Sequence, residues 1–166
     1  FCHNAPLVTE IDKNYFLDQG EIIDFLKKRV GILDGVVITG GEPTLMRDLP
    51  EFICEIKSLG YDVKLDTNGT NPEMLEYLIN NKMIDYVAMD IKNCLEKYHV
   101  TSGIDRTFDL GCIKRSAEIL MKNKIDFEFR TTVVSPYHTE EDFDKIGKWL
   151  AGEEKFYLQA FVDSKL

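Results

Sequence analysis

The chain has 166 residues, of which 44% are hydrophobic, so it can bury one sizeable core without a second domain. Its 20 basic and 29 acidic side chains give a formal net charge of −9, which repels phosphate backbones and argues against nucleic acid as a partner. The longest apolar stretches have only strand length, and this excludes a membrane-spanning helix. We therefore expect one soluble domain over residues 1–166 whose partner is a protein or a small molecule.

Strand-length runs of β-branched and aromatic residues alternate with helical patterns along the chain. In chain order the sequence predicts a helix over 21–29, a strand over 36–39, a helix over 48–59, a strand over 63–66, a helix over 73–81, a strand over 86–91, a helix over 111–123, a strand over 127–134, a helix over 140–150 and a strand over 156–161. Asn71 before Pro72 marks one helix start, and Thr139 with Asp142 nearly forms a capping box at another.

Crossovers of this length join parallel strands and are right-handed almost without exception. The pattern therefore predicts an α/β fold, part of an open (β/α)6 TIM-like barrel with parallel strands. Five strands are visible, and the missing first strand would be supplied by a segment before Phe1.

The clearest polar signature follows the strand predicted over 36–39, where the sequence continues as Gly40, Gly41 and Glu42. Two glycines and a carboxylate after an apolar run place bare backbone and one negative charge at the tip of a buried strand. A small cationic ligand could lie there against the main chain. The alternative is a βα loop whose glycines only allow a positive φ.

Polar residues also end the other predicted strands. In barrels of this kind the active site is built at the carboxyl ends of the strands. Eight polar residues from five strands fall at these ends: Glu42, Asp66, Thr67, Asn68, Asp90, Lys92, Arg130 and Gln159. Their convergence on one mouth predicts a ligand site, although no specific role is assigned to Gln159.

The chain begins abruptly with FCHN, without an initiator methionine or a signal segment, so we expect a fragment of a longer chain. FCHNAPL at positions 1–7, GGEPT at 40–44 and LDTNG at 65–69 together resemble the radical S-adenosylmethionine enzymes. Within them the chain is similar to the activating enzymes of glycyl-radical proteins, and most similar to the activase of anaerobic ribonucleoside-triphosphate reductase. The resemblance runs from Cys2 to Gln159 and covers the family's middle and late portion.

The resemblance implies a [4Fe–4S] cluster held by a C-x3-C-x2-C motif, in which Cys2 is the last ligand and the first two cysteines lie before Phe1. The iron left open in such a cluster can be chelated by the amino and carboxylate groups of S-adenosylmethionine. An electron from the cluster then cleaves the sulfonium bond and gives methionine and a 5′-deoxyadenosyl radical. Cys2 is therefore the predicted catalytic residue and cluster ligand.

The resemblance also implies which groups bind the rest of the cofactor. The turn of Gly40, Gly41 and Glu42 would hold the methionyl amino group. Lys92 and Arg130 suit the methionyl carboxylate, and Arg130 has the better fork for two parallel hydrogen bonds. Thr67 and Asn68 would contact the ribose or the carboxylate. Asn4 would contact the adenine.

Asp66 and Asp90 end neighbouring predicted strands. Two carboxylates brought together at a strand mouth either raise one pKa or require a cation between them. The resemblance extends to the pyruvate formate-lyase activase, and it implies that both residues help bind a monovalent cation beside the methionine moiety. Lys92 is the alternative source of the compensating charge.

The function that the resemblance implies is a radical S-adenosylmethionine oxidoreductase that abstracts hydrogen from a glycine Cα on a large anaerobic partner. Anaerobic ribonucleotide reductase is the first choice of partner, and pyruvate formate-lyase or another glycyl-radical enzyme is the alternative. The electron donor would be a protein such as flavodoxin or ferredoxin. A different class also stays open, namely a non-catalytic S-adenosylmethionine-binding or scaffold barrel. Cysteines three and seven positions before Cys2 would favour the enzyme.

The four cysteines show no C-x-x-C spacing, which removes a self-contained zinc or disulfide framework, and they suit a reducing cytoplasm. Cys54 lies in an apolar helical pattern and is predicted to be a core thiol, and Cys112 is interpreted in the same way. His99 and His138 are interpreted as surface histidines, because no second metal ligand lies at helical or hairpin spacing.

Overall fold

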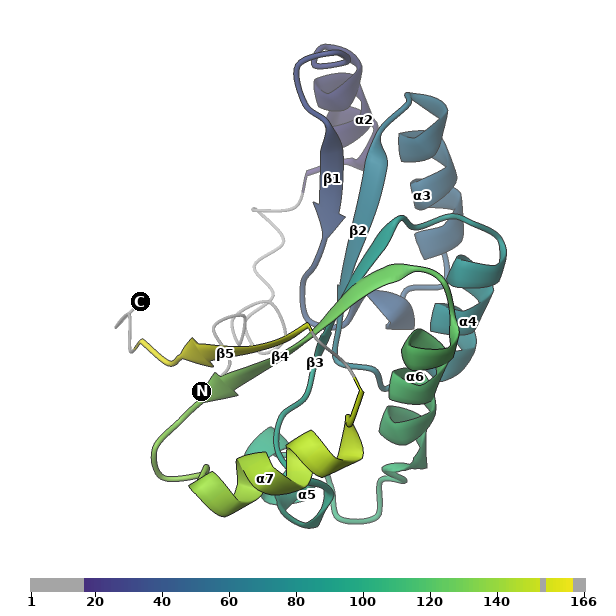
Figure 1. Cartoon of the computed structure of the whole chain (residues 1–166). Helices are drawn as coiled ribbons and strands as arrows, with labels where there is room; N and C mark the ends of the chain where they lie inside the picture. The colour runs from purple at the N-terminus through teal and green to yellow at the C-terminus, as the bar shows by residue number, and fades with distance from the viewer. Residues whose placement is uncertain (1–16, 153–154, 163–166) are drawn as a thin grey trace.

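The computed structural model describes residues 17–152 and 155–162, and within them five strands form one sheet in the order β1-β2-β3-β4-β5 (Figure 1). Each neighbouring pair is parallel, which confirms the predicted α/β class. The strands are β1 Gly35–Ile38, β2 Asp62–Thr67, β3 Tyr86–Asp90, β4 Asp126–Val133 and β5 Phe156–Ala160. A strand order that follows the sequence is the order of a barrel, and the curvature that turns β4 and β5 away from β1 is visible in Figure 1.

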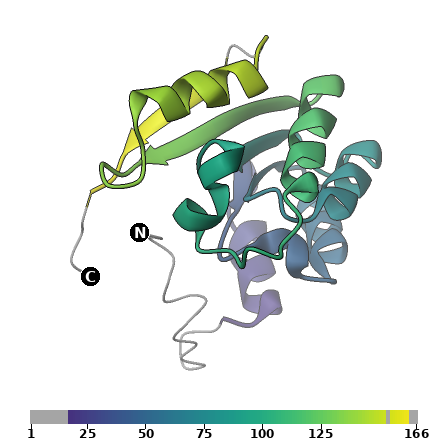
Figure 2. The same ribbon diagram turned by 90° about the horizontal axis from the view of Figure 1, so that it is seen from below.

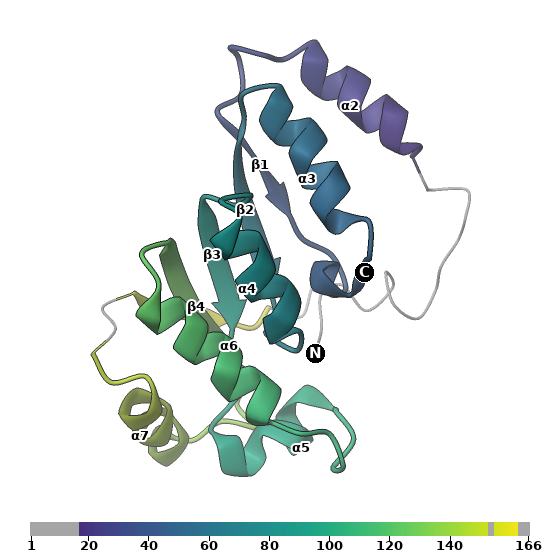
Figure 3. The ribbon, with the colours of Figure 1, turned by 90° about the vertical axis from the view of Figure 1, so that its right-hand side faces the viewer.

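Helices α3, α4 and α6 cover one face of this sheet, as Figures 1 and 3 both show. The helices are α2 Gln19–Lys27, α3 Leu49–Ser58, α4 Pro72–Asn80, α5 Tyr98–Ser102, α6 Gly111–Lys122 and α7 Glu140–Trp149, with short 3-10 turns η2 Pro43–Leu45 and η3 Leu95–Lys97. All five predicted helices are present within two residues of their expected bounds. The α5 helix and the two 3-10 turns were not expected.

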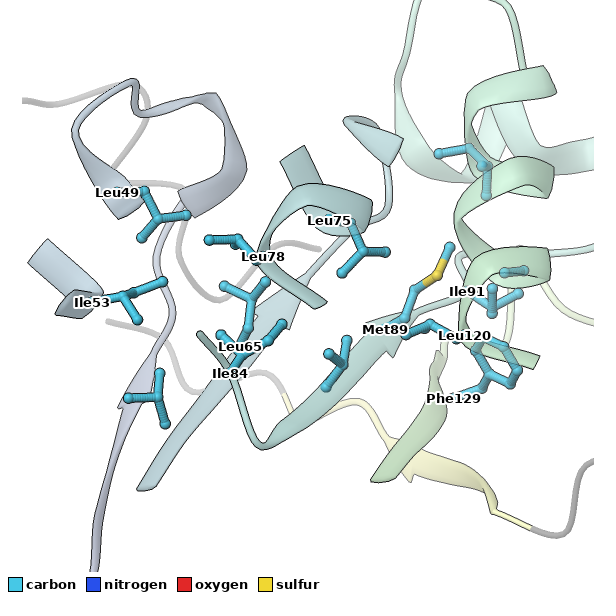
Figure 4. Close-up of a cluster of buried hydrophobic side chains, with 14 of the residues drawn as sticks. Leu49, Ile53, Leu65, Leu75, Leu78, Ile84, Met89, Ile91, Leu120 and Phe129 are labelled. Atoms are coloured by element: carbon cyan, nitrogen blue, oxygen red, sulfur yellow. The ribbon is translucent and has the colours of Figure 1, made fainter. Parts of the chain in front are cut away.

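The core lies between the sheet and these helices. Along β2 the side chains of Val63, Leu65 and Thr67 are buried toward the helices, whereas the alternate residues Lys64 and Asp66 are only half-buried. The helices complete the core with aliphatic side chains, several of which Figure 4 shows, among them Ile53, Leu75, Leu78 and Leu120. The opposite face of the sheet therefore carries the polar and charged residues.

Two helix starts follow the predicted capping chemistry. The Asn71 side chain accepts a hydrogen bond from the Met74 N–H, and Pro72 is the first residue of α4. The Asp142 carboxylate accepts from both the backbone N–H and the hydroxyl of Thr139, so this contact is made more fully than the sequence suggested. Among the described residues, no helix is long and apolar enough to cross a membrane.

Three of the expectations about cysteines and histidines are wrong. Cys54 is exposed, because in α3 the buried face runs through Leu49, Ile53 and Ile56, and Cys54 points away from it. Cys112 is only half-buried at the start of α6. His138 is not a surface residue, since only 7% of it is exposed and both ring nitrogens have partners.

Candidate functional site

A cavity of about 420 Å³ opens at the carboxyl ends of the strands, the end that Figure 2 views. Every predicted site residue in the described part of the chain lines it: Gly40, Gly41, Glu42, Asp66, Thr67, Asn68, Asp90, Lys92, Arg130 and Gln159. The structure thus brings together side chains from all five strands, as the strand-end argument predicted. Their contacts with a ligand stay predictions.

The Glu42 carboxylate ties the turn after β1 to the end of β2. Its Oε1 accepts hydrogen bonds from the Thr44 N–H at 3.2 Å, from the Thr44 hydroxyl, and from the Thr67 hydroxyl at 2.7 Å. Its Oε2 accepts from the Asn68 N–H at 2.7 Å. Glu42 therefore has a structural role that the sequence did not reveal, and Oε2 is the oxygen with room for a further donor such as an ammonium group.

The glycine turn leaves open space beside this carboxylate. Gly40 has a φ of 152°, a conformation that L side chains rarely adopt, and a Cβ built on it would meet no heavy atom within 4 Å. A ligand can therefore approach the backbone at Gly40. The positive φ of Gly40 also agrees with the alternative of a glycine that serves the turn, and contact with a ligand stays a prediction.

Thr67 and Asn68 are held by local hydrogen bonds rather than presented freely. The Thr67 hydroxyl, in a side chain that is nearly buried, donates to Glu42 and accepts from the Gly69 N–H at 3.1 Å. Asn68 Oδ1 accepts from the Thr70 N–H at 3.0 Å. These contacts fix the loop after β2 against the loop after β1.

Arg130 lies between the two carboxylates at the ends of β2 and β3. Its Nε and Nη2 donate to Asp90 Oδ1 at 3.2 and 3.1 Å, and its Nη1 donates to Asp66 Oδ2 at 3.3 Å. Lys92 Nζ bonds the other Asp90 oxygen at 2.9 Å. The compensating charge between the carboxylates thus comes mainly from Arg130, together with the Lys92 that the sequence suggested.

A second layer of charge supports Arg130 from the same face of the sheet. Glu128 accepts from Lys64 Nζ at 3.1 Å and from the Tyr86 hydroxyl at 3.0 Å, and it lies 3.9 Å from Arg130 Nη1. Burial and the Glu128 carboxylate raise the pKa of Tyr86 to about 12, so the phenol keeps its proton and remains a donor. Burial lowers the pKa of Arg130, but the charges of Asp90 and Asp66 raise it by more. The net pKa lies above its usual value, and the guanidinium stays charged.

Asp66 keeps one oxygen without a hydrogen-bond donor. Its Oδ1 is buried and accepts no hydrogen bond, and Lys64 Nζ lies 4.0 Å from this oxygen. A buried carboxylate oxygen without a donor is costly, so this atom suits a positively charged or hydrogen-bonding ligand group. The described cavity lining therefore fits a cationic ligand, or a monovalent cation held with one.

One wall of the cavity comes from a segment that sequence reasoning missed. This segment comprises α5 and the residues just after it. It contributes four residues to the cavity lining, namely Tyr98, Thr101, Ser102 and Ile104. The signal that could have found it is length, because about twenty residues separate β3 from α6, more than a simple crossover loop needs.

The predictions for Cys2 and Asn4 lie outside the described residues. Within residues 17–152 and 155–162, no group of three or more His, Cys, Asp or Glu side chains could hold a metal ion. The cluster ligand and the adenine contact therefore stay predictions.

Residues 1–150 match the family model described as the Radical SAM superfamily, and the chain therefore belongs to this superfamily. It is 37% identical over 165 residues to the "Putative glycyl-radical enzyme activating enzyme MJ1227" of Methanocaldococcus jannaschii, covering 97% of this chain and 67% of that protein. It is also 34% identical over 150 residues to the "Probable GTP 3',8-cyclase" of Saccharolobus islandicus. The chain spans 46% of the length of that protein.

Solved structures share the fold. The chain resembles "Native anSMEcpe with bound AdoMet and Kp18Cys peptide" with a TM-score of 0.66 at 21% identity, over 90% of this chain and 44% of that one. It resembles Streptococcus suis SuiB bound to precursor peptide SuiA with a TM-score of 0.69 at 13% identity, over 95% of this chain and 36% of that one. At these identities the likeness concerns the fold alone, and it confirms the predicted partial barrel.

Proposed function

We propose that the chain is the core of a radical S-adenosylmethionine activating enzyme that generates a glycyl radical on a partner such as anaerobic ribonucleotide reductase. The observation that carries the proposal is the cavity at the carboxyl ends of the five strands, whose charged lining complements S-adenosylmethionine. The name of the Methanocaldococcus jannaschii relative supports the choice of a glycyl-radical partner. The structural neighbour anSMEcpe was solved with bound AdoMet, and the ligand of that protein agrees with the proposal.

The described residues have distinct tasks in this proposal. The open turn at Gly40 and Glu42 Oε2 receive the methionyl ammonium. Lys92 and the N–H groups of Arg130 that do not bond Asp66 or Asp90 receive the carboxylate. When bound, a [4Fe–4S] cluster held in part by Cys2 supplies the electron that cleaves the sulfonium bond.

The partner would contact the protein at the open end of the barrel, because the glycine Cα must reach the cavity. The proposed electron donor is a small redox protein such as flavodoxin or ferredoxin. These assignments rest on the family's shared chemistry and not on a residue that selects one partner.

The test uses the full-length protein with the residues encoded before Phe1, reconstituted without oxygen. The assay measures 5′-deoxyadenosine release, and the glycyl radical by electron paramagnetic resonance, with and without a glycyl-radical partner. Cys2→Ala should abolish both signals, because the cluster loses one thiolate. Cys54→Ala is the matched control, since Cys54 is exposed on α3, and it should leave both signals unchanged.

The two halves of the proposal fail in different ways. Undiminished release from Cys2→Ala would refute the cluster assignment. Release without any glycyl radical on the candidate partners would refute the activating role and leave a radical S-adenosylmethionine enzyme with another substrate. No release at all from the reduced, reconstituted protein would favour the non-catalytic scaffold.

A further inference from the structure

The connections that follow β3 and β4 are joined by two buried side chains, Asn93 and His138. Asn93 is fully buried and His138 is 7% exposed, and neither lines the cavity. The 3-10 turn η3, which follows β3 and precedes α5, contacts the start of α7, which follows β4, through the 2.7 Å ion pair of Lys97 with Asp142. The two side chains therefore connect neighbouring βα loops from behind the cavity wall.

Asn93 holds the wall segment to the loop after β4. Its Nδ2 donates to the Thr101 hydroxyl at 2.8 Å and to the Tyr137 carbonyl at 3.0 Å, and its Oδ1 accepts from the Cys94 N–H at 2.7 Å. Thr101 is itself a lining residue. One buried amide thus fixes a wall residue relative to the next βα loop.

His138 holds the backbone of Lys92. Its Nε2 lies 2.8 Å from the Lys92 carbonyl oxygen, which can only accept, so Nε2 carries the proton. In the tautomer with the proton on Nε2 alone, Nδ1 accepts from the Val134 N–H at 3.1 Å, and it lies 3.3 Å from the Val134 carbonyl oxygen. The ring also stacks on Phe143, with centroids 5.6 Å apart. These three contacts leave the imidazole one orientation.

Lys92 links this buried contact to the site. Its side chain forms the 2.9 Å ion pair with Asp90, whose other oxygen bonds Arg130. A shift of the Lys92 backbone would therefore move an ammonium group that faces the cavity and would change the charge pairing of Asp90.

We propose that His138 is a positioning residue for the cofactor site. Through its hydrogen bond to the Lys92 carbonyl it sets the place of the Lys92 ammonium, and thereby the affinity for the carboxylate of S-adenosylmethionine. The inference rests on the proposed function, because it takes S-adenosylmethionine as the ligand of the cavity.

Two substitutions separate the two bonds of the ring. His138→Asn puts an amide oxygen near the position of Nδ1, so it keeps the Val134 contact but cannot reach the Lys92 carbonyl. His138→Gln puts an amide N–H near the position of Nε2 and restores that bond. With one net hydrogen bond at stake, His138→Asn should weaken S-adenosylmethionine binding about five- to tenfold, and His138→Gln should stay within about twofold of the parent.

A matched control measures the cost of losing any buried bond to a carbonyl. The buried Tyr61 hydroxyl donates to the Leu26 carbonyl at 2.7 Å, and neither residue lines the cavity. Tyr61→Phe should lower the thermal unfolding temperature without changing S-adenosylmethionine affinity. A fall in affinity for His138→Asn that Tyr61→Phe does not share is the expected result.

A double-substitution cycle tests whether the effect passes through Lys92. Binding is measured by equilibrium dialysis on the full-length protein, with circular dichroism to verify folding. In a Lys92→Met background, His138→Asn should no longer weaken binding, because the ammonium that it positions is gone. If His138→Asn weakens binding as much in that background as in the parent, or if all His138 variants bind equally well, the inference about His138 is overturned but the proposed function is not. A parent protein that binds no S-adenosylmethionine would overturn the proposed function itself.

Discussion

Replacing Glu42 with glutamine tests whether this residue holds the site together or only meets the ligand. The amide oxygen of Glu42→Gln can still accept from Thr44 and Thr67. The amide nitrogen would then face the Asn68 N–H, which now bonds Oε2 at 2.7 Å, and two donors cannot pair. The substitution therefore removes one charge-assisted hydrogen bond and leaves a backbone N–H unpaired.

The magnitude follows from that single bond. Hydrogen bonds to charged groups contribute about 1.5–3 kcal/mol, and the part-buried position of Glu42 lowers the expected loss to about 1–2 kcal/mol. For a chain of this size each kcal/mol shifts the thermal midpoint by about 2–4 °C. We therefore expect a fall of roughly 2–8 °C before any ligand is added, together with weaker S-adenosylmethionine binding.

The assay is thermal unfolding of the ligand-free protein, followed by equilibrium dialysis with S-adenosylmethionine. Glu118→Gln serves as the control, because Glu118 forms only an exposed ion pair with Lys122 on α6, and it should change neither quantity. If Glu42→Gln leaves the midpoint unchanged but abolishes binding, Glu42 acts only as a ligand contact, and the structural role assigned to its four hydrogen bonds is wrong.

Four further substitutions or ligands give equally direct tests. Gly69→Ala should destabilise the fold by about 1–3 kcal/mol in urea titrations, because Gly69 has a φ of 76° and a Cβ there would clash with Met89 Cε. Burial alone would raise the pKa of Asp142, but hydrogen bonds from Lys97 and Thr139 have the larger effect and bring it below its usual 3.8. Stability from Asp142 is therefore complete above about pH 4 and is lost as the pH falls from there toward the lowered pKa of the folded state. Thermal midpoints measured between about pH 2 and 6 should show that Asp142→Asn removes this acid-side loss. Arg130→Ala should weaken S-adenosylmethionine binding about 10- to 100-fold in dialysis, and Arg130→Lys should recover only part of it. S-adenosylhomocysteine should bind more weakly than S-adenosylmethionine, with a gap that narrows as salt rises.

The arrangement of strands and helices could be predicted from sequence because local and long-range signals agree. Alternating burial in β2 and the apolar stripes of α3 and α4 follow directly from periods of two and 3.6 residues. The location of the site could be predicted as well, since parallel strands place their carboxyl ends at one edge of the sheet. This rule alone was enough to predict that the charged residues of the cavity lie together.

Side-chain partners inside the site could not be predicted in the same way. The four bonds of Glu42 depend on how closely two loops approach, and the place of Arg130 between Asp66 and Asp90 depends on the register of β4 against β3. The burial of His138 depends on its pairing with the Lys92 carbonyl, 46 residues away in sequence. Contacts of this range leave no periodic trace along the chain.

The charge of the described lining agrees with the ligand that we propose for the cavity. Glu42, Asp66 and Asp90 supply three carboxylates, and Lys92 and Arg130 supply two cations, which leaves one negative charge. S-adenosylmethionine carries an ammonium, a sulfonium and a carboxylate, and so one net positive charge. The cations bonded to Asp90 can meet the ligand carboxylate. Asp66 Oδ1, which accepts no hydrogen bond, and the carboxylate of Glu42 remain for the positive groups of the ligand. Loss of the sulfonium charge removes this match but leaves the carboxylate contacts, and for that reason the comparison with S-adenosylhomocysteine isolates the electrostatic part of recognition.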